Sequence, residues 1–76
     1  MNKEKLNAAI GASLKNARKQ RRMTQEQVAD AVGISRSVLT RYELGSIELS
    51  MPMFVAICEA IGVNYAEILE GIDASK

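Results

Sequence analysis

A chain of 76 residues, with ten basic and nine acidic side chains and a net charge of +1, has room for one small domain, predicted over residues 1–76. One cysteine excludes a disulfide framework, and the absence of histidine excludes the usual zinc sites and removes the commonest general base, so no metal, cofactor or enzymatic activity is expected. The longest apolar run, 51–58, is far below the ~18 residues of a membrane helix, and no signal peptide precedes it, so a cytoplasmic protein without a membrane partner is expected.

Charge is unevenly distributed along the chain. Residues 1–22 carry seven basic residues and one acidic residue (+6), residues 23–45 carry two and three (−1), and residues 46–76 carry one and five (−4). A domain polarised in this way can bind an anionic polymer with one end and leave the other end accessible.

The first predicted helix covers about 3–21. Leu6, Ile10 and Leu14 repeat at intervals of four, and Ala17 continues the stripe three residues later, which is the spacing of one helical face. The basic residues near its end suit the negative C-terminal pole of a helix dipole.

Four further helix starts share one pattern. Each has a good N-cap residue with an apolar residue before it and another four positions after it, the arrangement called a hydrophobic staple. Gln27 and Glu67 also stand where a capping box places its second residue. The four predicted caps are Thr24, Ser35, Ser50 and Asn64.

The predicted helix ends agree with these starts. Gly33, Gly45 and Gly62 each follow an apolar stretch and can adopt the left-handed conformation that ends a helix. Pro52 falls in a first turn, where its missing N–H costs little. We therefore predict an all-α domain of five helices with 71–76 as a frayed tail. The predicted helices are 3–21, 25–32, 36–44, 51–61 and 65–70.

The stretch 24–45 carries the functional signal. The chain turns within about three residues at Gly33, so the helices on either side cross steeply, with the small Ala29 at the crossing. Once the apolar positions of the second helix are set aside, its remaining face holds only basic and hydroxyl side chains. These residues are Arg36, Ser37, Thr40 and Arg41.

This face has the chemistry to read the major groove of double-stranded DNA. Arginine can donate two parallel hydrogen bonds to guanine, serine and threonine can bond several base edges, and a threonine methyl can contact a thymine methyl. Arg36 and Ser37 occupy the first turn, the part of a recognition helix that reaches deepest. The alternatives are a solvated face, phosphate contact alone for Arg41, and simple exposure for Ser37 and Thr40.

Phosphate contacts are expected from the start of the preceding helix and from the basic residues upstream of it. A helix N-terminus offers unpaired N–H groups to anions, and lysine and arginine add affinity that is independent of sequence. The residues predicted to contact phosphate are Thr24, Gln25, Lys19, Arg21 and Arg22.

Several short stretches between about residues 6 and 70 carry a resemblance to a known family, and no gap interrupts their spacing. They are Ala17-Arg18, Thr24-Gln25-Glu26, Val28-Ala29, Gly33-Ile34-Ser35-Arg36, Tyr42-Glu43 with Gly45, Ile57, Ala60-Ile61-Gly62-Val63 and Ile68-Leu69. With these residues the chain resembles the lambda-repressor-like DNA-binding domains, also called Cro/C1 or XRE-type helix-turn-helix domains. It departs from them at Leu49, where proline is common in the family.

The resemblance implies roles for individual residues. Gln25 takes the family's phosphate-binding place and the four face residues take its base-reading places. Arg18 and Glu43 occupy a pair that often forms a salt bridge between the first helix and the end of the third. Glu26 and Asp30 are either solvated or form an acidic patch able to touch RNA polymerase.

Dimerisation is expected because one recognition helix reads only a few base pairs. The apolar residues near the fifth helix and in the loop before the fourth exceed what a small core needs, so a homodimer interface is predicted there. Its residues are Ile47, Leu49, Ile68, Leu69 and Ile72.

The sequence therefore predicts a transcriptional regulator that binds a pseudo-palindromic operator as a dimer. The repressors of phages and mobile elements and the controllers of restriction–modification systems are of this type. The alternative is an antitoxin or another protein-interaction module, bound to a toxin or antirepressor, whose DNA binding serves autoregulation. Cys58 is expected to be a buried small residue, with a redox sensor as its alternative.

Overall fold

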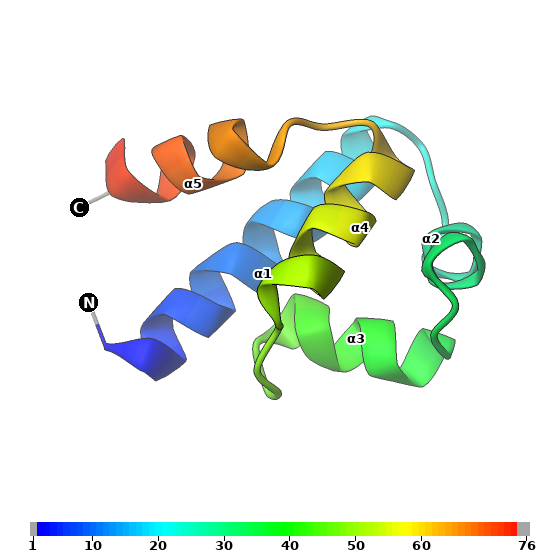
Figure 1. The fold of residues 1–76 in the computed structure, drawn as a ribbon, viewed down its shortest axis with the longest axis horizontal. Coiled ribbons are helices and arrows are strands. Elements are labelled where there is room, and N and C mark those ends of the chain that lie inside the picture. The colour runs from blue at the N-terminus through cyan, green and yellow to red at the C-terminus, as the bar shows by residue number, and fades with distance from the viewer. Residues whose placement is uncertain (1, 75–76) are drawn as a thin grey trace.

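The computed structural model describes residues 2–74, which form five helices (Figure 1). α1 packs against α3, α4 and α5, and α2 packs against α3 and α4, so the long first helix is the spine of the domain. The start of α1 and the end of α5 lie on the same side in this view. The helices are α1 (Lys3–Gln20), α2 (Gln25–Val32), α3 (Arg36–Leu44), α4 (Met51–Ile61) and α5 (Tyr65–Ala74).

The all-α prediction is confirmed, and α2, α3 and α4 have the predicted bounds. α1 ends one residue earlier than predicted. The prediction of a frayed tail from residue 71 is wrong for residues 71–74, which continue α5, and residues 75–76 lie outside the described part of the chain. The physical reason is Ile72, which lies four residues after Ile68 on the same face and is 7% exposed, so burial of its side chain holds the last turn on the core.

Side-chain caps begin the helices as predicted. The hydroxyl groups of Thr24, Ser35 and Ser50 each accept a hydrogen bond from the backbone N–H three residues later. At α2 the capping box is complete, because the Gln27 side chain accepts from the Thr24 N–H. At α5, by contrast, the cap side chain accepts from the N–H two residues on, and among the described contacts the predicted box with Glu67 is not formed.

Two glycines allow α1 and α3 to approach closely. A Cβ on Gly11 would lie 2.3 Å from the carbonyl oxygen of Tyr42, inside any permitted contact. Gly45, which ends α3 with φ +73°, would place a Cβ 2.5 Å from the Cα of Ala8. The end of α3 therefore packs directly on the backbone of α1, which fixes the angle between the two helices.

Among the described residues, ten buried apolar residues form the core, and α4 supplies four of them. Two residues of the predicted dimer interface, Ile68 and Ile72, belong to this core, and Leu49 and Leu69 pack against it. The premise that Ile68 and Ile72 exceed the needs of the core is thus wrong, because α5 folds back onto α1 and both side chains are buried within one chain. Ile47 is half-buried in the loop before α4.

In the described part of the chain, no single helix is long and apolar enough to cross a membrane. α4 and the following helix together meet that measure by length and composition, but they are bent by 109° at the break between them. Phe54, Ile57, Cys58 and Ile61 of α4 are buried in the core.

Candidate nucleic-acid interface

The face of α3 predicted to read bases lies largely at the surface. Arg36, Ser37 and Arg41 are exposed and Thr40 is half-buried, while Leu39 and Glu43 turn inward. Because helical residues four and seven apart share a face, positions 37, 41 and 44 form the outermost row, and positions 36, 40 and 43 form the edge beside α2. The structure thus separates the four predicted residues into two rows.

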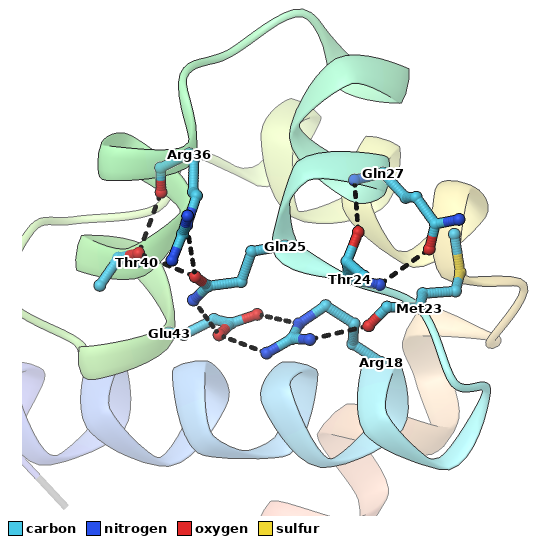
Figure 2. Close-up of polar contacts among 8 residues, drawn as sticks. All are labelled: Arg18, Met23, Thr24, Gln25, Gln27, Arg36, Thr40 and Glu43. Atoms are coloured by element: carbon cyan, nitrogen blue, oxygen red, sulfur yellow. Dashed lines mark hydrogen bonds and ion pairs between the residues drawn. The ribbon is translucent and has the colours of Figure 1, made fainter.

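A buried ion pair fixes α3 on α1. Arg18 Nε donates to Glu43 Oε2 at 2.7 Å and Arg18 Nη2 donates to Glu43 Oε1 at 3.1 Å, with both residues less than 10% exposed. Arg18 Nη1 also donates to the backbone carbonyl of Met23 at 2.8 Å (Figure 2). This forked arginine therefore holds three elements at once: its own helix, the turn that leads into α2, and the end of α3.

Gln25 extends this pair to the surface of α3. Its Nε2 donates to Glu43 Oε1 at 3.0 Å, and because a carboxylate only accepts, the amide must turn its oxygen the other way. That oxygen accepts from Arg36 Nε at 3.4 Å and from Thr40 Oγ1 at 3.3 Å (Figure 2). The whole 36–40–43 edge of α3 is therefore hydrogen-bonded to one side chain from the first turn of α2.

The predicted phosphate-contacting residues are distributed over two places. Thr24 and Gln25 line a hollow of about 480 Å³ at the start of α2, together with Arg18 and Arg36. The hollow is open to solvent at a helix N-terminus, where backbone N–H groups favour an anion. Glu26 also lines it, and its carboxylate lies 3.9 Å from Arg36 Nη1.

The basic residues at the end of α1 do not line that hollow. Lys19, Arg21 and Arg22 are all exposed. A Cβ on Gly62 would lie 3.0 Å from Arg21 Nη1, so the guanidinium of Arg21 sits beside the C-terminus of α4, whose partial negative charge attracts it. Arg22 takes a left-handed conformation with φ 57°, which ends α1 without a glycine.

Sequence reasoning missed Leu44, which is 65% exposed and lies on the outermost row of α3. It follows Arg41 by three residues and Ser37 by seven, so the same helical spacing could have found it. It also missed the carbonyl of Met23, which no side-chain pattern reveals, and the need for glycine at position 11.

The single cysteine is part of the core rather than of this surface. Cys58 is 1% exposed, and burial raises the pKa of its thiol to about 11. A thiol that stays protonated and buried is a poor nucleophile, which agrees with the expectation of a small core residue.

Comparison with known proteins gives the family to which the chain belongs. A family model described as helix-turn-helix matches residues 14–68. The antitoxin PezA of Streptococcus pneumoniae is 40% identical over 60 residues, which are 79% of this chain and 38% of PezA. The uncharacterized HTH-type transcriptional regulator YqaE of Bacillus subtilis is 39% identical over 64 residues, 84% of this chain and 55% of YqaE. The chain thus spans less than two thirds of either relative.

Solved structures show the same architecture. A crystal structure of the clp gene regulator ClgR from Corynebacterium glutamicum superposes with a TM-score of 0.87 at 30% identity, over 92% of this chain and 91% of that one. A second crystal structure of ClgR has the same TM-score and identity and is covered over 74% of its length. The chain belongs to the helix-turn-helix family of DNA-binding transcription regulators, of the Cro/C1 or XRE type.

Proposed function

We propose that this protein is a repressor that binds a pseudo-palindromic operator as a dimer and blocks a promoter. The observation that carries the proposal is the exposure of Arg36, Ser37 and Arg41 on α3, beside an open helix N-terminus. It acts by binding rather than by catalysis, in the cytoplasm, with double-stranded DNA as its partner. The family to which the chain belongs supports the DNA-binding part of the proposal.

Base reading falls to the first turn of α3. Arg36 is 66% exposed at its side chain, with Nε facing Gln25 and Nη1 3.9 Å from the exposed Glu26 carboxylate. On binding, a guanine would replace that long ion pair, and the Nη atoms would donate to its O6 and N7 atoms. Ser37 and Arg41 lie on the outermost row, where the major groove would receive them. The hollow at the start of α2 takes a backbone phosphate, which sets the register of the helix without reading sequence.

Two such domains are needed to specify a site in a genome, with half-sites about 10 base pairs apart or a multiple of that spacing. Ile47, Leu49 and Leu69 keep partly exposed surface on the loop before α4 and on α5, away from the recognition row. Light scattering at tens of micromolar, with and without operator DNA, measures this association. A monomer under both conditions would refute the dimer.

The decisive experiment selects bound sequences from random DNA and then compares two variants on the selected operator. Arg36→Ala is expected to lose about 1–3 kcal/mol of binding free energy and to relax base choice at one position. Lys19→Ala is the control: it weakens selected and random DNA alike and lowers the salt slope by about one. Equal losses on operator and random DNA for Arg36→Ala would contradict its reading role.

A second candidate is an antitoxin whose DNA binding serves autoregulation. The observation that favours it is the 40% identity to a protein named as an antitoxin. Purification of the tagged chain from its own host, followed by mass measurement of the intact complex, distinguishes the two. A stoichiometric protein partner supports the antitoxin, whereas an operator-bound homodimer supports the repressor.

The acidic side chains on α2 suit one further contact of a promoter-bound regulator. Glu26 and Asp30 lie one turn apart and are both exposed, beside the proposed DNA-binding face. They would lie within reach of RNA polymerase at an adjacent promoter site. Transcription in vitro with Asp30→Asn measures this: unchanged regulation at equal operator occupancy rules the contact out.

A further inference from the structure

We propose that Thr40 recognises a thymine through its methyl group and donates no hydrogen bond to a base. The inference deepens the proposed DNA-binding function and rests on it. Thr40 lies on the 36–40–43 edge of α3, one turn after Arg36 and beside Gln25 (Figure 2).

The hydroxyl of Thr40 has one proton, and two acceptors within the protein compete for it. Thr40 Oγ1 lies 3.0 Å from the carbonyl oxygen of Arg36 and 3.3 Å from Gln25 Oε1. Whichever acceptor takes the proton, Thr40 has no second proton to donate to guanine O6 or N7 or to thymine O4. Hydrogen-bond donation from Thr40 to a base is thereby excluded while these contacts persist.

The acceptor on Gln25 is held in place from below. Its amide cannot flip without turning the oxygen toward Glu43, a carboxylate that only accepts hydrogen bonds. Glu43 in turn is fixed by two hydrogen bonds from Arg18. The buried ion pair therefore keeps the Gln25 oxygen, a hydrogen-bond acceptor, facing Thr40. In this way the pair of Arg18 and Glu43 sets the orientation of the Thr40 hydroxyl.

A fixed hydroxyl also fixes the methyl. Both groups are bonded to the same tetrahedral Cβ, so when Oγ1 faces Gln25 and the Arg36 carbonyl, the methyl faces elsewhere. Thr40 is half-buried, so part of its surface stays accessible, and the methyl is the part of the side chain that these hydrogen bonds leave free. The structure thus presents a preset methyl group at the edge of the recognition face.

In the major groove the thymine C5-methyl is the one apolar group that a base edge offers. Contact between two methyl groups removes in total roughly one CH₂ equivalent of apolar surface from water, which corresponds to about fourfold in affinity. Thr40 lies four residues after Arg36, about 6 Å along the helix, or about two base-pair steps of 3.4 Å. The thymine is therefore expected within about two base pairs of the guanine read by Arg36.

The test replaces each thymine of the selected half-site by deoxyuridine, which deletes only the methyl group. For the wild-type protein one replacement is expected to weaken binding about fourfold, and the others to have little effect. Thr40→Ser keeps the hydroxyl but lacks the methyl, so it should be insensitive to that replacement. Thr40→Val keeps the methyl and lacks the hydroxyl, so it should remain sensitive.

A second probe separates the methyl from the rest of the base. Cytosine placed at the same position should bind the wild type weakly, and 5-methylcytosine should regain part of the loss, because its methyl occupies the same place in the groove. Circular dichroism melts of both variants establish that they fold like the wild type before their affinities are compared.

Each outcome bears on the proposal. Wild-type binding that is indifferent to deoxyuridine at every position overturns it, and so does a Thr40→Ser variant that stays as sensitive as the wild type. Sensitivity lost in Thr40→Val but kept in Thr40→Ser would assign the role to the hydroxyl instead. If the random-DNA selection enriches no sequence at all, the proposed function itself fails, which is a different result from an enriched site without methyl recognition.

Discussion

α3 and α4 begin and end with the same kinds of local signal, but they have different roles in the domain. Each begins at a serine cap whose hydroxyl accepts an N–H hydrogen bond, and each ends at a glycine with positive φ. They have nine and eleven residues, so length does not separate them either. What separates them is the side chains: α3 presents charged and hydroxyl groups outward, whereas α4 has one charged residue, Glu59. Local signals thus decide that a helix forms, and its outward face decides what it does.

The inward faces of the two helices differ as well. α4 is anchored by apolar burial, with Ile57 fully enclosed among core side chains. α3 has Leu39 in the core but is also anchored by Glu43, a buried charge that depends on Arg18 and Gln25 for its hydrogen bonds. An ionic anchor is directional, so it fixes the rotation of α3 in a way that apolar contact alone would leave looser. A helix that reads base edges needs that directional control.

The largest expected effect comes from breaking the ionic anchor. Glu43→Ala leaves the Arg18 guanidinium buried without its carboxylate and should lower the free energy of unfolding by about 3–5 kcal/mol, measured by urea denaturation. The double variant Arg18→Met with Glu43→Leu should lose much less, because no charge stays buried. A single variant that loses under about 1 kcal/mol would show that the ion pair does not anchor the helix.

The next effect concerns the seat of α3 on α1. Gly11→Ala places a methyl group 2.3 Å from a backbone carbonyl of α3, so the helices must separate, and a loss of about 3 kcal/mol is expected in the same denaturation experiment. Gly71→Ala is the matched control in α5, where nothing lies within 4 Å of the added carbon. It should raise stability by about 0.5–1 kcal/mol, as alanine does in an unobstructed helix. Equal effects of the two changes would contradict the close approach.

These anchors also mark how far the sequence could be read. Cap residues, staples and glycines act within a few neighbours along the chain, so Thr24, Ser35 and Ser50 located three helices correctly. α5 extends beyond residue 70 because Ile72 reaches the core. That contact joins residues far apart in the chain, so the periodicity of residues 65–70 does not reveal it. For the same reason, Ile68 and Ile72, which were assigned to a dimer interface, proved to belong to the core.

The site was predictable as a list of residues but not as an arrangement. Helical spacing gave the outward face of α3, and the resemblance gave the pairing of Arg18 with Glu43. Neither indicated that Gln25 would bond three residues of α3 at once, because that depends on the angle between two helices. Arg21 was grouped with the phosphate contacts by its charge, although its guanidinium lies beside the end of α4.

The apolar anchor of α4 has a pH dependence of its own through Cys58. Burial raises the pKa of this thiol from 9.0 to about 11, so the folded state disfavours the thiolate. The stability contributed by the neutral thiol is fully present below pH 9 and is lost as pH rises from 9 to 11, because the unfolded chain ionises first. At pH 10 the loss is about 1.4 kcal/mol. Unfolding measured at pH 8 and pH 10 should show this extra slope in the wild type and lack it in Cys58→Ala. Parallel slopes would mean that the thiol ionises equally in both states.

The smallest effect gives the sharpest comparison, because it makes the same change at the start of both helices. Ser35→Ala and Ser50→Ala each remove one cap hydrogen bond, and each should cost about 1 kcal/mol of stability.

The consequences of the two changes for DNA binding should differ. Loss of the Ser35 cap loosens the first turn of α3, which carries Arg36, so operator binding should weaken several-fold beyond what the lost stability explains. Loss of the Ser50 cap loosens the first turn of α4, which holds no proposed contact with DNA, and operator affinity should stay within twofold of wild type. Fluorescence anisotropy with operator and random DNA, at a temperature where both variants are folded, measures the difference. If both variants lost operator affinity to the same extent, binding would depend on the stability of the whole domain rather than on the order of the α3 N-terminus, and the division of labour between the two helices would be wrong.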